Sequence, residues 1–403
     1  MRVSNKILFF VLDGASDRPV GNMTPLQSAI TPNLDKLADT GISGIMDTIS
    51  PGIRPGSDTA HLSLLGYDPY KYYTGRGPFE AAGVGIDVQP GDVAFRCNFA
   101  TLEDGNIVDR RAGRIRETSE LARSISENVD VGVDFIFKES TGHRAAMLLR
   151  GEGLSADVTS NDPKKEDKPI KEFHANSPEA EKTAKVLNDF VAQSIKVLED
   201  HPVNIERKNS GKPQANVILA RGAGLVPEMM SFEAKYGLKP AVVAAAGLVI
   251  GIGKMCGMEH IGFDGGTGGV DSDVMGKVKT ALKALEDHDF VLVNIKGADE
   301  AGHDGAFEKK RDFISKVDEA FTDVLDLKDT MVVVTADHST PVSIRDHSAD
   351  PVPIMINGYG VRVDNVCAYN EIDAAKGGLH RIKGMDLMHI LMDLINRTEK
   401  FGA

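Results

Sequence analysis

The chain has little cysteine. Cys97, Cys256 and Cys367 are its three thiols among 403 residues, and no two of them form a CxxC pair. Three scattered cysteines cannot build a disulfide framework, and a zinc site made of cysteines needs closely spaced pairs. We therefore expect a protein of a reducing compartment, the cytoplasm.

Long apolar runs and an excess of positive charge are also missing. The segment 241–253 is shorter than the roughly 20 residues that cross a bilayer. The apolar stretch at residues 7–12 ends in Asp13 with no small-residue cleavage site after it, which indicates a core strand and no signal peptide. The net charge of -13 repels nucleic acid and acidic lipid. We expect neither partner, and an anionic substrate must be bound by local basic groups.

What the chain does have is length and a repeated strand pattern. Apolar, β-rich runs at 7–12, 290–295 and 331–335 are each followed within a few residues by an acidic residue, and helical spacing at 306–327 joins the last two. This βαβ pattern predicts an α/β fold with a mostly parallel sheet flanked by helices. Residues 86–225 differ from the rest of the chain in their pattern of apolar and polar residues, which predicts an inserted smaller α/β or α+β domain. The first domain would then be discontinuous, at 1–85 and 226–403.

The acidic residues that follow these strands are Asp13, Asp299 and Asp337. In a parallel sheet, ligands bind outside the carboxyl ends of the strands, so the three carboxylates should converge there. His303 lies four residues after Asp299, His338 is adjacent to Asp337, and His347 follows a short loop. Mixed aspartate and histidine ligands suit divalent ions. The alternative is capping aspartates and exposed histidines in turns.

Ser57 follows a Pro-Gly pair at the start of an apolar helical pattern, where free backbone N–H groups favour an anion. The alternative is a serine that caps the helix. Two divalent ions would lower the proton affinity of the hydroxyl. Their four positive charges would balance three aspartates and an ionised Ser57, which suits in-line phosphoryl transfer.

Five segments resemble the metal and nucleophile motifs of the alkaline phosphatase superfamily: VLDG, PGSDTAHLSLLGYDP, DEAGHDG, TADHS and HSADPVP. They resemble most closely the cofactor-independent phosphoglycerate mutases, and residues 75–86 and 95–114 resemble the archaeal-type branch. The resemblance implies an alkaline-phosphatase-like fold. It also implies interconversion of 3-phosphoglycerate and 2-phosphoglycerate, in glycolysis and gluconeogenesis, with no 2,3-bisphosphoglycerate.

The resemblance further implies a set of ligands for each of two ions, which could be Mn²⁺, Co²⁺, Zn²⁺ or Mg²⁺. One ion would be held by Asp13, Ser57, Asp337 and His338, and the other by Asp299, His303 and His347. Ser57 would be the phosphorylated residue. A mutase of this kind must keep water from its phosphoserine, so the inserted domain would close over the site and bind the glycerate carboxylate.

Basic residues are the candidates for that carboxylate contact. They are Arg110, Arg111, Arg114, His143, Arg144 and Arg221, with Lys235 outside the insert. A solvated surface role is the alternative for each arginine. We expect Asp162 to lie in a solvated charged loop at 160–169, His61 to pack its helix, and the glycine-rich segments 251–257 and 262–270 to be turns.

Two other functions remain open. A metal-dependent phosphatase or a pentose-phosphate mutase could be built on the same core motifs. A metal-binding protein without catalysis would keep the same ligands. The sequence carries no heptads or other signature of an oligomer.

Overall fold

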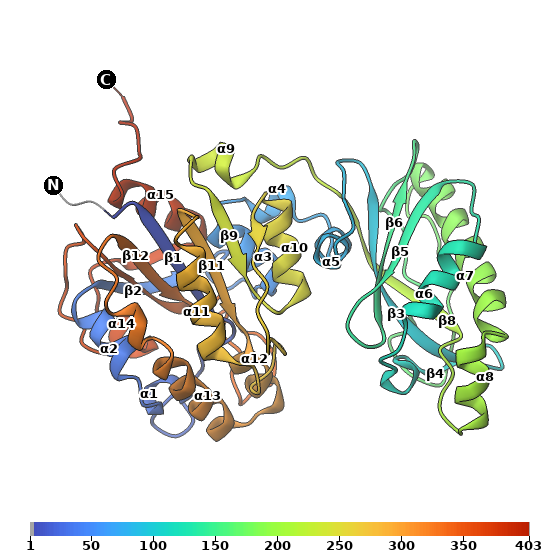
Figure 1. Ribbon diagram of the computed structural model, residues 1–403, viewed down its shortest axis with the longest axis horizontal. Helices are drawn as coiled ribbons and strands as arrows, with labels where there is room; N and C mark the ends of the chain where they lie inside the picture. The colour runs from blue at the N-terminus through green and yellow to red at the C-terminus, as the bar shows by residue number, and fades with distance from the viewer. Residues whose placement is uncertain (1–3, 403) are drawn as a thin grey trace. The chain divides into compact units, whose positions relative to one another are not determined.

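The computed structural model describes residues 4–402. The chain forms two compact units, Met1–Tyr72 with Met230–Ala403 and Tyr73–Met229, and each has its own sheet (Figure 1). Within the described residues, no helix has the length and apolar character that a membrane span requires.

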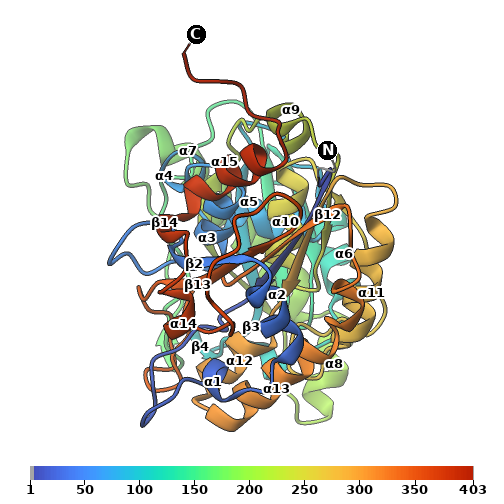
Figure 2. The same cartoon turned by 90° about the vertical axis from the view of Figure 1, so that its left-hand side faces the viewer.

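The first unit contains an eight-stranded sheet that is parallel except for one reversed strand. In sheet order, the strands are β10 (Glu259–His260), β9 (Pro240–Val243), β11 (Phe290–Ile295), β1 (Lys6–Leu12), β12 (Thr330–Thr335), β13 (Val352–Asn357), β2 (Ile42–Asp47) and β14 (His380–Lys383). Only β13 runs antiparallel to its neighbours, β12 and β2, and Figure 2 shows β13 beside β2. The predicted α/β class and mostly parallel sheet are confirmed.

Helices pack on this sheet because its central strands are apolar on both faces. The helices of the first unit are α1 (Pro25–Ser28), α2 (Pro32–Asp39), α3 (Ser57–Leu64), α4 (Pro69–Tyr72), α9 (Phe232–Tyr236), α10 (Gly247–Met255), α11 (Val274–Ala284), α12 (Gly297–Asp304), α13 (Phe307–Glu319), α14 (Glu371–Ala374) and α15 (Gly384–Leu394), with a 3₁₀ turn at Thr322–Val324. Leu8 and Phe10 of β1 share one core with α2, α11 and α13, while α10 and α15 contact α3. The helix expected at 306–327 is present as α13 and the 3₁₀ turn, and the segment of Asp299 and His303 forms a further helix, α12, that was not expected.

The second unit is built on an antiparallel sheet with the order β5-β6-β3-β4-β7, and β8 pairs with β3. Its strands are β3 (Val93–Glu103), β4 (Asn106–Asp109), β5 (Asp134–Glu139), β6 (Arg144–Arg150), β7 (Lys168–Pro169) and β8 (Val217–Leu225). Its helices are α5 (Gly77–Gly83), α6 (Ser119–Asn128), α7 (Glu181–Glu199) and α8 (Pro202–Asn209), with 3₁₀ turns at Ala112–Arg114 and Pro178–Ala180.

The second unit begins earlier than the sequence boundary of 86. Helix α5 packs on β3, β6 and β8, where Ala81 joins Ala94, Ala146 and Leu148 in a small core. The approach is so close that a Cβ at Gly77 would lie 2.0 Å from the Ala94 carbonyl oxygen. The helix covers one face of the antiparallel sheet, so the boundary lies at Tyr73, and the far boundary lies at Met229 instead of 225.

Candidate metal centre

The three carboxylates expected at strand ends lie together. Asp13 follows β1, Asp299 lies in α12 directly after β11, and Asp337 follows β12. These strands are parallel neighbours whose last residues pair, Leu12 with Ile295 and Val11 with Thr335. Figure 1 shows β11 leading into α12 at this edge of the sheet.

The histidines complete two groups of ligand atoms. The atoms of Asp13, Asp337 and His338 lie within 4.8 Å of one another, as do those of Asp299, His338 and His347. His338 Nε2 is 3.3 Å from Asp337 Oδ2 and 3.7 Å from Asp13 Oδ1. His347 Nε2 is 3.5 Å from Asp299 Oδ1. His338 therefore stands where the two groups meet, and its ring stacks on that of His347 with 3.6 Å between centroids.

His303 and Ser57 each contact one member of these groups. His303 Nε2 is 3.4 Å from Asp299 Oδ1, and Ser57 Oγ is 3.1 Å from His338 Nε2. Gly56 occupies the N-cap of α3, so Ser57 is the first helical residue and its hydroxyl does not cap the helix. The alternative of a capping serine is therefore excluded.

The three carboxylates of the centre differ in how far their charge is compensated, and the pKa is raised only for Asp13. Burial, followed by the charge of Asp337, raises the pKa of Asp13 to about 7. Burial also acts to raise the pKa of Asp299, but the hydrogen bond from His347 and the charge of Lys296 hold it below its usual value. Asp337 Oδ2 is buried and has no hydrogen-bond partner among the described residues. An unpaired carboxylate oxygen among imidazole nitrogens fits a divalent cation.

Three residues of the centre were not in the expected set. Lys296 Nζ is 3.2 Å from Asp13 Oδ1 and 2.7 Å from Asp299 Oδ2. The Thr340 hydroxyl contacts Asp299 and His338. Asn294 donates to Asp13 Oδ2 at 3.0 Å. The only signal in the sequence was their position, within three residues of a strand end or an expected ligand.

His61 packs within its own helix, as expected, and it also faces the centre. The side chain is fully buried, its Nδ1 donates to the Ser57 carbonyl at 2.7 Å, and the same atom is 3.6 Å from Asp337 Oδ2. One helical turn separates the two residues, which places His61 beneath Ser57 on α3.

The second unit carries a concentration of arginines on one face of its sheet. Arg96 of β3 lies opposite Arg221 of β8, and Arg144 of β6 lies opposite Asn98, two residues from Arg96. Like charges that face one another across strands are unfavourable, so this arrangement favours a bound anion. Arg96 was not predicted from the sequence, and its Nε has no hydrogen-bond partner in the described part of the chain.

His143 and Arg111 lie near this concentration. Burial, followed by the charges of the surrounding arginines, lowers the pKa of His143 to about 4, and the arginines responsible are Arg144, Arg111, Arg96 and Arg221. Arg114 is exposed and makes no side-chain hydrogen bond or ion pair within residues 4–402. Arg114 ends the 3₁₀ turn that follows Arg111, and its contact with substrate stays a prediction.

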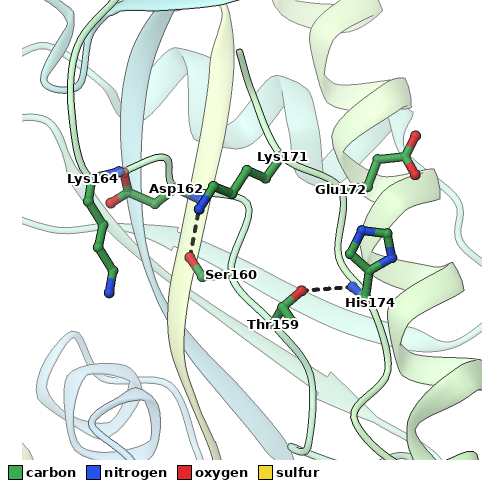
Figure 3. A pocket seen from close by; sticks show the side chains of 7 residues that line it. All are labelled: Thr159, Ser160, Asp162, Lys164, Lys171, Glu172 and His174. Atoms are coloured by element: carbon green, nitrogen blue, oxygen red, sulfur yellow. Dashed lines mark hydrogen bonds between the residues drawn. The ribbon is translucent and has the colours of Figure 1, made fainter. Parts of the chain in front are cut away.

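Asp162 is not solvated, contrary to expectation. Its side chain is 2% exposed and accepts hydrogen bonds from Arg110 Nη2 at 2.7 Å and Arg221 Nη1 at 2.5 Å. Asp162 also lines a cavity of about 540 Å³ together with Thr159, Ser160, Lys164, Lys171, Glu172 and His174 (Figure 3). The segment 160–169 is thus partly ordered by side-chain pairing, and β7 forms within it.

Lys235 lies elsewhere in the first unit. Its Nζ donates to the carbonyl of Gly66 and stands over the ring of Tyr67, 4.6 Å from the centroid. Gly66 follows the C-terminal end of α3, whereas Ser57 begins that helix. The ammonium of Lys235 contacts a backbone carbonyl and two aromatic rings, and its role in substrate binding stays a prediction.

Comparison with known proteins identifies the family. A family model described as 2,3-bisphosphoglycerate-independent phosphoglycerate mutase matches residues 38–204. A protein of that name from Methanoculleus marisnigri is 53% identical over 410 residues and covers 100% of both chains. Another from Methanosphaera stadtmanae is 54% identical over 409 residues and covers 99% of this chain and 100% of its own. The chain belongs to this family.

Two solved structures agree in fold with this chain. A protein from Pyrococcus horikoshii is 40% identical, with a TM-score of 0.87 and 100% of both chains covered. A cofactor-independent phosphoglycerate mutase from Thermoplasma acidophilum is 40% identical, with a TM-score of 0.74, and covers 98% of this chain and 100% of its own. The resemblance drawn from the motifs is confirmed for this archaeal group of phosphoglycerate mutases.

Proposed function

We propose that this chain interconverts 3-phosphoglycerate and 2-phosphoglycerate through a phosphorylated Ser57, with two divalent ions and without 2,3-bisphosphoglycerate. The observation that carries the proposal is the placement of Ser57 Oγ against His338 Nε2, between two acid-rich ligand groups. Relatives that match over the full length bear the name of this activity. A glycolytic role implies the cytoplasm.

The donor set suggests which residues hold each ion. Asp13, Ser57, Asp337 and His338 would hold one, and Asp299, His303 and His347 the other. Mixed carboxylate and imidazole donors suit Mn²⁺, Co²⁺ or Zn²⁺, and carboxylates with water admit Mg²⁺. Such ions would stabilise the serine alkoxide and the charge on the phosphoryl oxygens.

The reaction needs two in-line displacements on one phosphorus atom. Ser57 Oγ attacks the phosphorus of 3-phosphoglycerate, the bond to the 3-oxygen breaks, and the proton lost by Ser57 ends on the 3-hydroxyl of glycerate. The glycerate then turns, its 2-oxygen attacks the phosphoserine, and the 2-hydroxyl proton returns to Ser57. The position of Ser57 at the first turn of α3 directs backbone N–H groups toward the phosphoryl group.

The glycerate must stay bound while it turns, and the arginines of the second unit suit that task. Arg96, Arg144 and Arg221 share one face of a sheet, and a carboxylate would relieve their mutual repulsion. Asp162 holds Arg110 and Arg221 in fixed positions and leaves their remaining N–H groups for a ligand. We infer that these residues bind the substrate carboxylate.

The assay supplies 3-phosphoglycerate with Mn²⁺ and couples 2-phosphoglycerate to enolase. Ser57→Ala should lose turnover and keep divalent-ion binding. Ser63→Ala is the matched control, because Ser63 is buried in the same helix and its hydroxyl has no hydrogen-bond partner among the described residues. A chelator should abolish the activity of the native protein, and a divalent ion should restore it.

Two results would contradict the proposal. Free phosphate without 2-phosphoglycerate would identify a phosphatase. Full activity of Ser57→Ala would exclude the covalent step. Mass spectrometry of protein quenched during turnover should find one phosphoryl group on Ser57.

A further inference from the structure

The hydroxyl of Thr340 connects the two ligand groups of the proposed centre. Thr340 follows His338 by two residues and is fully buried. Its Oγ1 is 2.8 Å from Asp299 Oδ1 and 3.0 Å from His338 Nδ1. One small side chain therefore touches an expected ligand of each ion.

The direction of these two hydrogen bonds follows from proton counting. The hydroxyl has one hydrogen, and an ionised Asp299 can only accept, so Thr340 donates to Asp299. Thr340 then has only lone pairs to offer His338, so Nδ1 must be the protonated nitrogen of the ring. Nε2 carries the lone pair of the neutral imidazole.

That lone pair points at the centre of the site. His338 Nε2 lies 3.1 Å from Ser57 Oγ and 3.3 Å from Asp337 Oδ2. A neutral imidazole binds a cation only through its unprotonated nitrogen. In the metal-free protein, the ring therefore already has its unprotonated nitrogen at the position where a cation would bind.

The backbone of two glycines packs closely against Thr340. A Cβ at Gly14, whose φ is +65°, would lie 2.7 Å from Thr340 Oγ1, and one at Gly302 would lie 2.4 Å from the Thr340 carbonyl oxygen. Lys310 Nζ donates to the same carbonyl at 3.0 Å from a fully buried position. The two glycines therefore leave the space that Thr340 occupies between Asp299 and His338, and Lys310 fixes its backbone carbonyl.

We propose that Thr340 is a positioning residue that selects the Nδ1–H tautomer of His338 and thereby couples the two ion sites. Without the hydroxyl, an Nδ1–H would be buried with no acceptor, whereas an Nε2–H would face the carboxylates of Asp337 and Asp13. The other tautomer then dominates, and it presents a proton where the cation should bind. The proposal rests on the two-ion centre of the proposed function.

The direct test is the tautomer of His338 in the metal-free protein. Long-range ¹H–¹⁵N spectra of ¹⁵N-histidine-labelled protein distinguish a protonated from an unprotonated ring nitrogen, and His338→Gln assigns the signal. The native protein and Thr340→Ser should show a protonated Nδ1. Thr340→Val should show a protonated Nε2.

A second readout is Mn²⁺ binding by titration calorimetry of the metal-free protein. Thr340→Val should weaken the site that contains His338 by about 10- to 100-fold, as loss of a ligand's outer partner does elsewhere, and Thr340→Ser should restore it. Thr335→Val is the matched control. Thr335 is also buried, but its hydroxyl donates to the Pro353 carbonyl at 3.0 Å.

The outcomes separate this proposal from the mutase function. An Nε2–H tautomer in the native protein would overturn it even if Thr340→Val does not fold. Native Mn²⁺ affinity in a folded Thr340→Val would also overturn it. Failure of the native protein to convert 3-phosphoglycerate would sink the proposed function and leave the tautomer result standing.

Discussion

Replacing Lys296 by methionine should change metal-free stability and metal affinity in opposite directions. The Lys296 ammonium lies 3.2 Å from Asp13 Oδ1 and 2.7 Å from Asp299 Oδ2, so it stands between residues assigned to different ions. In the metal-free protein it is the cation that compensates these buried carboxylates. When divalent ions bind, the same ammonium repels them.

The magnitude follows from the contact distances. Unit charges about 3 Å apart attract by about 5 kcal/mol at an effective permittivity near 20. The Lys296 side chain is 30% exposed, so solvent screening and lost side-chain entropy reduce the net effect to about 2 kcal/mol. Lys296→Met should therefore lower the Tm of the metal-free protein by about 4 to 8 °C. It should tighten Mn²⁺ binding about 30-fold, which is the same free energy with the opposite sign.

Scanning calorimetry of metal-free protein and Mn²⁺ titration measure the two effects. Lys309→Met is the control, because Lys309 pairs with Asp304 and Glu300 on the surface of the same unit and should change neither quantity. Weaker Mn²⁺ binding by Lys296→Met, with an unchanged metal-free Tm, would refute the reasoning. It would show that the ammonium supports the metal site and does not compete for it.

Three further predictions concern other parts of the chain. Burial and four arginines lower the pKa of His143 to about 4, so on acidification the unfolded chain binds a proton at His143 at a higher pH than the folded chain does. The free energy of unfolding should therefore fall between pH 6.5 and about 4, and His143→Gln should flatten that part of its pH dependence. Asp162→Asn should raise KM for phosphoglycerate about tenfold with kcat nearly unchanged, because two arginines lose their shared anchor, whereas Glu172→Gln should have no effect on KM. Gly302→Ala should cost about 1–3 kcal/mol of unfolding free energy in denaturant titration, because its Cβ would meet a backbone carbonyl at 2.4 Å, whereas Gly247→Ala meets no atom within 4 Å.

The aspartates of the centre could be predicted from the sequence because they follow strands of a parallel sheet. Parallel neighbours end at the same edge, so Asp13, Asp299 and Asp337 were placed together without knowledge of any distance. Lys296 is the first residue after β11, yet a lysine at a strand end is common. The neighbouring sequence does not indicate that its ammonium reaches Asp13. Thr340 was missed for the same reason, since its partner Asp299 comes from another strand.

The second unit was less predictable because its chemistry depends on pairing across an antiparallel sheet. Arg96 and Arg221 become neighbours only through the register of β3 and β8, which includes an irregularity near this pair. Asp162 stands in a run of lysines and acids that is typical of a solvated loop. Its real partners, Arg110 and Arg221, are 52 and 59 residues away in sequence. Local composition carries no information on pairs at such separations.

The buried carboxylates themselves argue that cations are part of the folded protein. Burial of Asp13 without full compensation lowers stability, and the orphaned Asp337 Oδ2 shows that Lys296 does not satisfy every carboxylate oxygen of the centre. A ligand that binds only the folded state recovers this loss by mass action. The same excess of negative charge that weakens the metal-free centre therefore supplies the free energy that binds the ions. Asp13→Asn should therefore raise metal-free stability at neutral pH, because burial raises the pKa of Asp13 to about 7, while it abolishes metal binding.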